Sequence, residues 1–257
     1  MALGQTSLRP PTRSLLRWEI LAVFAVSLGA SALNAVLSLI RSLLTARSLG
    51  KQVALLVGSF APNHWLDLVF QLASIAETLA PVLLVLYLLT RSGESPSAIG
   101  LDASQPARDL ARGAALAAVI GGAGLGLYLV AFRLGASLNV VPEQLPAVWW
   151  RVPVLLLDSV QNGLLEEILV VGYLLHRLDQ LGWRPAWGIA ASALLRGTYH
   201  LYQGLGGFVG NAAMGVIFAL LYRRWGRVTP LIVAHALIDA FAFVGYAYLH
   251  GKVSWLP

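Results

Sequence analysis

The apolar stretch LLEEILVVGYLLHRL, residues 164–178, contains two adjacent glutamates, Glu166 and Glu167. With the apolar residues before it, this stretch is long enough to cross a lipid bilayer, which takes ~20 residues of helix. An ionisable side chain at that depth costs about 2.5–3.5 kcal/mol on insertion scales, so such side chains usually mark functional sites. The stretch therefore predicts a membrane helix that carries part of a buried polar site.

Two later apolar stretches contain ionisable groups in the same way. SALLRGTYHLYQG, residues 192–204, contains His200, and LIVAHALIDAFAF, residues 231–243, contains His235 and Asp239. Three segments that each supply a carboxylate or an imidazole predict one shared site, located where three helices meet.

The composition is that of a membrane protein. Hydrophobic residues make up 58% of the chain and charged residues 12%, whereas a soluble domain has roughly 25% charged residues. The apolar runs are long and unbroken, which excludes the alternating ~10-residue strands of a membrane β-barrel. We therefore expect an all-α fold, a polytopic membrane helix bundle.

The pattern of apolar runs predicts about seven transmembrane helices, with six to eight compatible with the sequence. A polar N-terminal arm over residues 1–17 precedes a single membrane domain over 18–257, and the polar site residues fall in its part of about 148–249. The expected spans are about 19–41, 66–90, 110–132, 148–178, 185–202, 207–222 and 229–249.

Three segments outside the site carry further expectations. Residues 45–60 are too short to span and are expected to form a re-entrant or interfacial helix, and residues 133–146, with two prolines, are expected to form a loop. In the third span, Gly122 and Gly126 have the spacing that allows a close helix approach.

The basic residues indicate topology rather than nucleic-acid binding. The net charge is +6, but Lys and Arg lie at the ends of apolar runs and not along one face. Their excess in alternate loops favours an integral, multi-pass protein of the cell membrane with a cytoplasmic N-terminus. The chain has no cysteine, which excludes disulfides and thiolate metal sites.

Helical spacing assigns faces to the polar groups. Asp158, Asn162 and Glu166 follow one another at intervals of four and share a face. Glu167 is about 100° further round an α-helix and is expected to point to a different place, where a structural partner holds it. Arg196 and His200 are one turn apart and share a face.

The pairing of a buried glutamate with a histidine suits the activation of water as a nucleophile. A second histidine with an Asp or Asn one turn later, here His235 and Asp239, suits the stabilisation of an oxyanion. Two histidines and a carboxylate are also a zinc ligand set, so Glu166, His200 and His235 are the metal ligands if a metal is present. No cofactor is otherwise expected.

The order and spacing of these residues resemble those of a known family. The patterns E-E-x-x-x-x-G-Y-L-L-x-R-L, S-A-L-L-x-G-x-x-H-L and P-L-I-V-A-H-A-L-I-D are similar to the CPBP family, the CAAX proteases and bacteriocin-processing enzymes, also called Abi-type intramembrane proteases. The resemblance covers about residues 95–245 and is specific between Glu166 and Asp239.

The resemblance implies an intramembrane endopeptidase that acts on membrane-associated or prenylated (CAAX-type) peptides within the lipid bilayer. It implies Glu166 and His200 as the residues that activate water, and His235 and Asp239 as those that stabilise the oxyanion. Members of the family have been described as metalloproteases, and others as glutamate-dependent enzymes without a metal.

The chain departs from the family pattern at three positions. Val171 stands where the first motif, EExxxR, has arginine; Arg196 stands where the second, FxxxH, has phenylalanine; Asp239 stands where the third commonly ends in asparagine. We interpret the first two changes as one event, in which Arg196 supplies from a neighbouring helix the cation that Val171 lacks. In that interpretation Glu167, Arg196 and Asn162 support the catalytic groups.

Two other functions fit the sequence. A catalytically inactive scaffold or immunity-type protein of the same fold is favoured by the altered motifs. A transporter with Glu77, Asp158 and Glu166 as a proton relay is a third class, which would predict inverted repeats that the sequence lacks.

Overall fold

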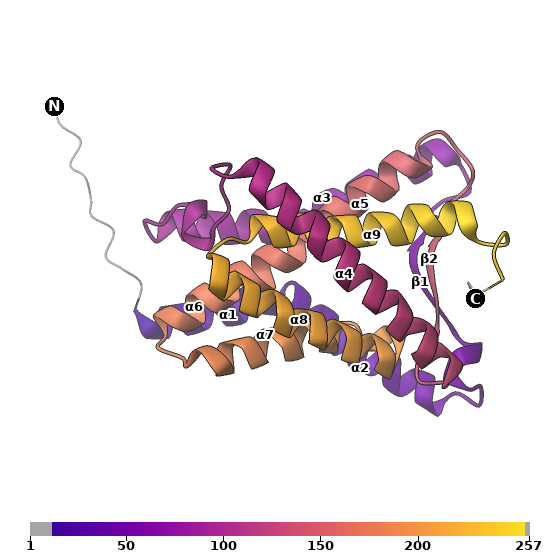
Figure 1. Cartoon of the computed structure of the whole chain (residues 1–257), viewed down its shortest axis with the longest axis horizontal. Helices are drawn as coiled ribbons and strands as arrows, with labels where there is room; N and C mark the ends of the chain where they lie inside the picture. The colour runs from indigo at the N-terminus through magenta and orange to yellow at the C-terminus, as the bar shows by residue number, and fades with distance from the viewer. Residues whose placement is uncertain (1–11, 255–257) are drawn as a thin grey trace.

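Most of the apolar runs become helices in the computed structural model, which describes residues 12–254 and confirms the all-α helical bundle (Figure 1). The long helices lie side by side, and a short β pair lies at the end of the bundle opposite to α6 (Figure 1). The elements are α1 (Arg13–Ala25), α2 (Leu28–Leu44), η1 (Leu49–Lys51), β1 (Val53–Gly58), α3 (His64–Arg91), η2 (Pro96–Ile99), α4 (Pro106–Arg133), β2 (Asn139–Gln144), α5 (Arg151–Glu166), η3 (Glu167–Tyr173), α6 (Leu174–Gln180), α7 (Pro185–Tyr199), η4 (Leu201–Gln203), α8 (Leu205–Trp225) and α9 (Thr229–Leu249).

The predicted count of seven membrane spans is not confirmed. Within residues 12–254, α3, α4, α8 and α9 are each long and apolar enough to cross a membrane, which gives four candidate spans. The bent pair of α1 and α2, with 50° between the two helices, makes a fifth if it counts as one span. Of the predicted N-terminal arm over 1–17, residues 1–11 lie outside the described residues, and α1 already begins at Arg13.

The expected helix over residues 45–60 and the expected loop over 133–146 are wrong in part. Residues 53–58 and 139–144 form the strands β1 and β2, which pair in parallel with Val53 opposite Asn139 and Val57 opposite Glu143. β-branched residues favour such pairing. The helices α3 and α4 carry the chain across the bundle and back, so both strands run in the same direction.

One continuous helical segment carries the glutamate pair. The α-helix α5 passes at Glu167 into the π-helix η3, which passes at Leu174 into α6. Residues 151–180 thus match the predicted fourth span in position. Every residue of η3 is buried, so this segment runs through the centre of the bundle.

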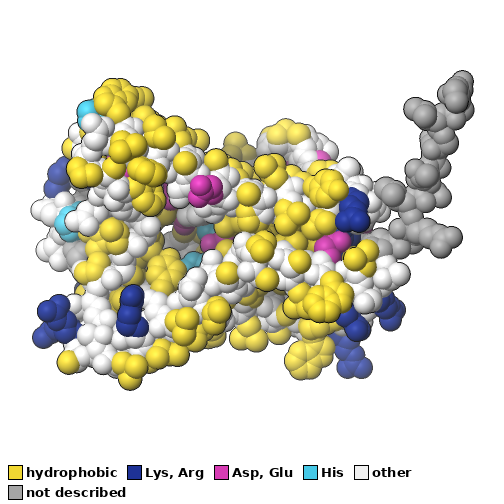
Figure 2. All heavy atoms as spheres, turned by 180° about the vertical axis from the view of Figure 1, so that it is seen from behind, with side chains coloured by type: hydrophobic (Ala, Val, Ile, Leu, Met, Phe, Trp, Pro, Cys, Tyr) yellow, Lys and Arg dark blue, Asp and Glu magenta, His cyan; other side chains and the backbone are white. Residues whose placement is uncertain are grey.

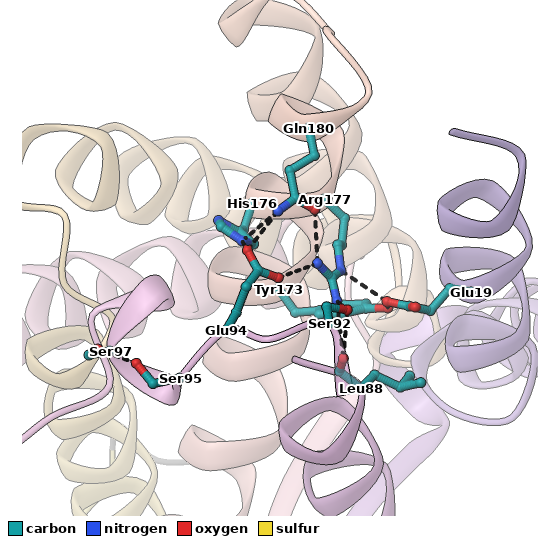
Figure 3. A network of polar contacts seen from close by, with 10 residues as sticks. All are labelled: Glu19, Leu88, Ser92, Glu94, Ser95, Ser97, Tyr173, His176, Arg177 and Gln180. Atoms are coloured by element: carbon teal, nitrogen blue, oxygen red, sulfur yellow. Dashed lines mark hydrogen bonds and ion pairs between the residues drawn. The ribbon is translucent and has the colours of Figure 1, made fainter. Parts of the chain in front are cut away.

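A buried arginine holds the α6 end of this segment to two other helices (Figure 3). The Arg177 guanidinium is fully buried and donates hydrogen bonds to Glu19 of α1 at 2.9 Å and to Glu94, after α3, at 2.5 Å. Tyr173 donates a hydrogen bond of 2.6 Å to the same Glu19 carboxylate, and His176 contacts Glu94 at 2.6 Å. These charge-assisted contacts fix the depth of the segment relative to α1 and α3.

Glycines set the contact between α4 and α9, but not those that the spacing predicted. A Cβ on Gly113 would lie 2.4 Å from Val233 Cγ1 and 2.9 Å from the Pro230 carbonyl oxygen, so α4 and α9 meet closely at Gly113. A Cβ on Gly122 or Gly126 would meet no atom of the described residues within 4 Å, so the predicted close approach at these two glycines is absent from that part of the chain.

We expect Gly113→Ala to destabilise the protein by about 1–3 kcal/mol, because the added methyl group overlaps Val233 and must push α4 away from α9. Gly122→Ala is the matched control and should be neutral or slightly stabilising. Thermal unfolding in detergent measures both. Equal midpoints for the two variants would show that α4 and α9 do not meet at Gly113.

The contact of Glu94 with its partners predicts a pH dependence. Partial burial raises the pKa of Glu94, but the hydrogen bond and charge of His176 and the charge of Arg177 outweigh burial and hold the pKa below its usual 4.5. A carboxyl group with a lowered pKa in the folded state stabilises the fold above its unfolded-state pKa, and this contribution is lost as the pH falls through the folded-state pKa. Glu94→Gln should therefore lower the unfolding midpoint at pH 7, and the difference from the unsubstituted protein should shrink well below pH 4.5. A difference independent of pH would contradict this role.

Candidate active site

Three helical segments bring the predicted site residues together. The segment α5–η3 supplies Glu166 and Glu167, α7 and its C-cap supply Arg196 and His200, and α9 supplies His235 and Asp239. Gly163, one turn before Glu166, allows the approach of α5 to α9, because a Cβ there would lie 2.9 Å from the Ile232 carbonyl oxygen.

Glu167 is the centre of the site. Its side chain is 0% exposed, and its Oε1 atom accepts hydrogen bonds from Arg196 Nη2 and His235 Nδ1, each at 2.6 Å. Arg196 is also 0% exposed and lies over the ring of Phe218. One carboxylate thus joins all three segments, and its buried charge is balanced by the guanidinium.

Glu166 lies at the edge of this cluster. Its side chain is 11% exposed, its Oε2 atom accepts a hydrogen bond of 2.6 Å from the Tyr199 hydroxyl, and Arg196 Nη1 is 3.9 Å away. The Tyr199 contact was not predicted from the sequence. The position of this tyrosine one residue before His200 was the available signal, since the end of α7 turns both rings towards α5.

The geometry defines the tautomer of His200. Its Nδ1 atom lies 3.0 Å from the Arg196 carbonyl oxygen, and because a carbonyl can only accept, Nδ1 carries the proton of a neutral ring. Nε2 is then the acceptor nitrogen, free to take a proton. His200 is partly exposed and interacts electrostatically with Glu166.

His235 is joined to a second polar pair. Its Nε2 atom is 3.8 Å from Asp239 Oδ2, which accepts a hydrogen bond of 2.9 Å from Asn162 Nδ2. The predicted supporting role of Asn162 therefore has a defined contact, across from α5 to α9. Asp158, one turn before Asn162, is also partly exposed.

The surface of the bundle has a hollow with acidic and histidine side chains inside it (Figure 2). The face opposite to the view of Figure 1 is covered largely by apolar side chains, as a lipid-facing surface should be, and it opens between the helices onto acidic and histidine side chains (Figure 2). Asp158, Asn162, His200 and Asp239 are each partly exposed, whereas Glu167 and Arg196 are fully buried. One side of the site is therefore accessible from the surface, and the other side is buried.

The expectation that the two glutamates point to different places is wrong in part. Coordinating atoms of Glu166, Glu167 and His235 all lie within 4.8 Å of one another. Glu167 begins the π-helix η3, and its carboxylate lies beside that of Glu166. The two carboxylates still differ in partners and in exposure.

These three residues are a different set from the predicted metal ligands, because Glu167 takes the place of His200. Arg196 lies 2.6 Å from one carboxylate and 3.9 Å from the other. A divalent cation between the two carboxylates would meet that guanidinium charge at close range. The donor set therefore fits an ion-paired carboxylate site better than a zinc site.

The fold and the site define an integral, multi-pass membrane protein with a polar site buried between its helices. Residues 148–241 match the family model for Rce1-like proteins, described as type II CAAX prenyl endopeptidases. This match supports membership of the CPBP family, as the motifs predicted, and with it a protease character in general. It covers the segment with all of the site residues but not residues 95–147, to which the predicted resemblance extended. The searches of curated proteins and of solved structures found no match.

We expect Arg196→Ala to cost about 3–5 kcal/mol of stability, because it leaves the buried Glu167 carboxylate without its cation. Arg223→Ala, which removes a partly exposed arginine paired with Asp179, should cost less than about 1 kcal/mol. Chemical denaturation in detergent micelles compares the two. If Arg196→Ala were as mild as Arg223→Ala, Arg196 would not be the replacement for the cation that Val171 lacks.

Proposed function

We propose that this chain is an intramembrane endopeptidase that hydrolyses a peptide bond of a membrane-associated or prenylated substrate. The observation that carries the proposal is the difference between the two glutamates. Both partners of Glu167, Arg196 and His235, bind the same carboxylate oxygen, and the Glu167 side chain is fully buried. The Glu166 side chain is 11% exposed, and His200 has an acceptor nitrogen at Nε2. A carboxylate and a neutral imidazole beside an opening to water are the groups that water activation needs.

In this mechanism Glu166 and His200 Nε2 orient a water molecule and take its proton as its oxygen bonds to the carbonyl carbon. The Tyr199 hydroxyl holds the Glu166 carboxylate in place. The carbonyl oxygen becomes an oxyanion, and the proton later passes to the amine that leaves when the carbon–nitrogen bond breaks. The water oxygen thus ends in the new carboxyl group, and the transferred proton ends on the amine.

The oxyanion is assigned to the His235 side of the site. An ionised Asp239 can only accept hydrogen bonds, so it does not stabilise the oxyanion directly; its carboxylate is held by Asn162 Nδ2 and lies 3.8 Å from His235 Nε2, too far to take the Nε2 proton and close enough to favour the orientation of the ring. His235 Nε2–H is then the donor to the oxyanion, and the Glu167 carboxylate at Nδ1 favours the charged form of the ring. Asp239 is a positioning residue in this proposal.

The substrate class rests on the family alone. The Rce1-like description names prenyl endopeptidases, and a prenyl chain would occupy lipid beside the apolar face while the peptide reaches the hollow. We propose a metal-free reaction, supported by the guanidinium between the two carboxylates. The N-terminus is proposed to be cytoplasmic, on the distribution of Lys and Arg.

We expect purified protein in lipid nanodiscs to cleave a prenylated CAAX peptide, detected by mass spectrometry. Glu166→Gln and His200→Ala should each lower kcat/KM by roughly 10²–10⁴-fold, because each removes a group that handles the proton of water. His250→Ala, at the exposed end of α9, is the matched control and should leave the rate unchanged. Addition of a chelator should have no effect, and inhibition by it would favour zinc.

The second candidate function is a catalytically inactive scaffold or immunity-type protein. It is favoured by the close approach of Arg196 to Glu166, at 3.9 Å, which this chain has in place of the motif arginine. Retention of cleavage in a folded Glu166→Gln variant, or absence of cleavage with unmodified and prenylated peptides alike, would support this function over the enzyme.

A further inference from the structure

Glu77 is a carboxylate on the outside of the bundle at the middle of a candidate membrane span. It lies on α3, thirteen residues from His64 and fourteen from Arg91, which is roughly 20 Å of helix from either end. Its side chain is exposed, on a helix whose exposed neighbours include Leu72, Leu83 and Tyr87. Because α3 is a candidate membrane span, an exposed side chain at its middle is expected to face lipid near the centre of the bilayer.

No other described residue accounts for this carboxylate. Within residues 12–254, Glu77 makes no ion pair and no side-chain hydrogen bond, whereas Glu166, Glu167, His235 and Asp239 are joined in one cluster. Glu77 is not part of that cluster, so the proton relay with Asp158 and Glu166 has no contact to support it. A lone carboxylate facing lipid is costly and usually has a partner.

The surface around Glu77 suits a helix as that partner. Ala73, Ala76 and Ala80 are all exposed on the same side of α3 and surround Glu77. Ala76 and Ala80 have the spacing of two small residues separated by three, which lets the backbones of two membrane helices approach closely. A close approach brings a side chain as short as glutamate within reach of a group on the opposite helix.

We propose that this face of α3, defined by Ala73, Ala76, Glu77 and Ala80, is the interface between two copies of this chain. A twofold axis perpendicular to the membrane places each residue opposite its own copy at the same depth. Two carboxyl groups that face each other can share one proton in a hydrogen bond, so a glutamate is complementary to its own copy. Two copies thus satisfy each other's carboxyl group at the depth where neither has a partner of its own.

The chain contains no cysteine, so single-cysteine variants report on this face directly. We expect at least one of Ala73→Cys, Ala76→Cys and Ala80→Cys to form a disulfide-linked dimer of the full chain in lipid bilayers under mild oxidation. Ala118→Cys, at an exposed alanine of α4, is the matched control and should stay monomeric. Absence of a linked dimer from all three α3 variants, while each remains folded, would overturn the proposal.

Substitutions of Glu77 separate its role from that of the alanines. Glu77→Gln keeps a donor and an acceptor and should retain the dimer, while Glu77→Leu should lower the association constant in bilayers by ~3- to 10-fold, the range of one interhelical hydrogen bond. Ala80→Leu should weaken association and Ala118→Leu should not. Because Glu77 and Ala80 face outward, the unfolding midpoint should change little.

Two further results would overturn the proposal. Equal association of Glu77→Leu and the unsubstituted chain would show that Glu77 does not bind its copy. Cross-linking of the α3 cysteines in native membranes to a different protein, with none to a second copy, would show that another membrane helix covers this face.

Discussion

The buried pairing of Glu167 with Arg196 and His235 is the interaction on which the site depends. One carboxylate oxygen accepts a hydrogen bond from each of two helices at 2.6 Å, in a region where nothing but protein could satisfy these charges. If one partner were lost, the others would remain charged and buried at a cost of several kcal/mol. This interdependence fixes the relative rotation of α7, α9 and the π-helix. The catalytic candidates Glu166 and His200 are neighbours of these fixed residues, so their geometry follows from the same contact.

Two polar clusters hold the central helical segment, residues 151–180, to the rest of the bundle. At the α6 end, Arg177 ties the segment to α1 and to the residue after α3, and at its centre Glu167 ties it to α7 and α9. Both clusters use an arginine whose side chain is 0% exposed, which suits a guanidinium because it stays charged when buried. Between the clusters lies the buried π-helix. A π-helix is rare and is frequently found at functional sites, and here it begins at the second of two neighbouring carboxylates.

Arg196 places a positive charge beside the two glutamates from a neighbouring helix. Val171 is fully buried among apolar residues, so the π-helix itself supplies no cation. Arg196 reaches both carboxylates from α7 and also packs over Phe218. A positive charge thus lies near the glutamates although the π-helix carries none. The site depends on which charged side chains lie close together in space, and a motif along one helix shows only the charges of that helix.

From the sequence alone, the membrane class, the helical architecture and the meeting of three polar segments could be predicted, because apolar runs and ionisable interruptions are local properties that depend on the bilayer. The pairing of Arg196 with Glu167 could also be anticipated, since a buried guanidinium needs a carboxylate. The tertiary structure alone decided the rest. The β1–β2 pair joins segments more than eighty residues apart, the two carboxylates lie together at the start of a π-helix that no residue pattern signals, and the Tyr199 contact depends on how α7 ends. Each of these is set by which segments meet in space, and hydrogen bonds between distant segments leave no periodicity in the chain.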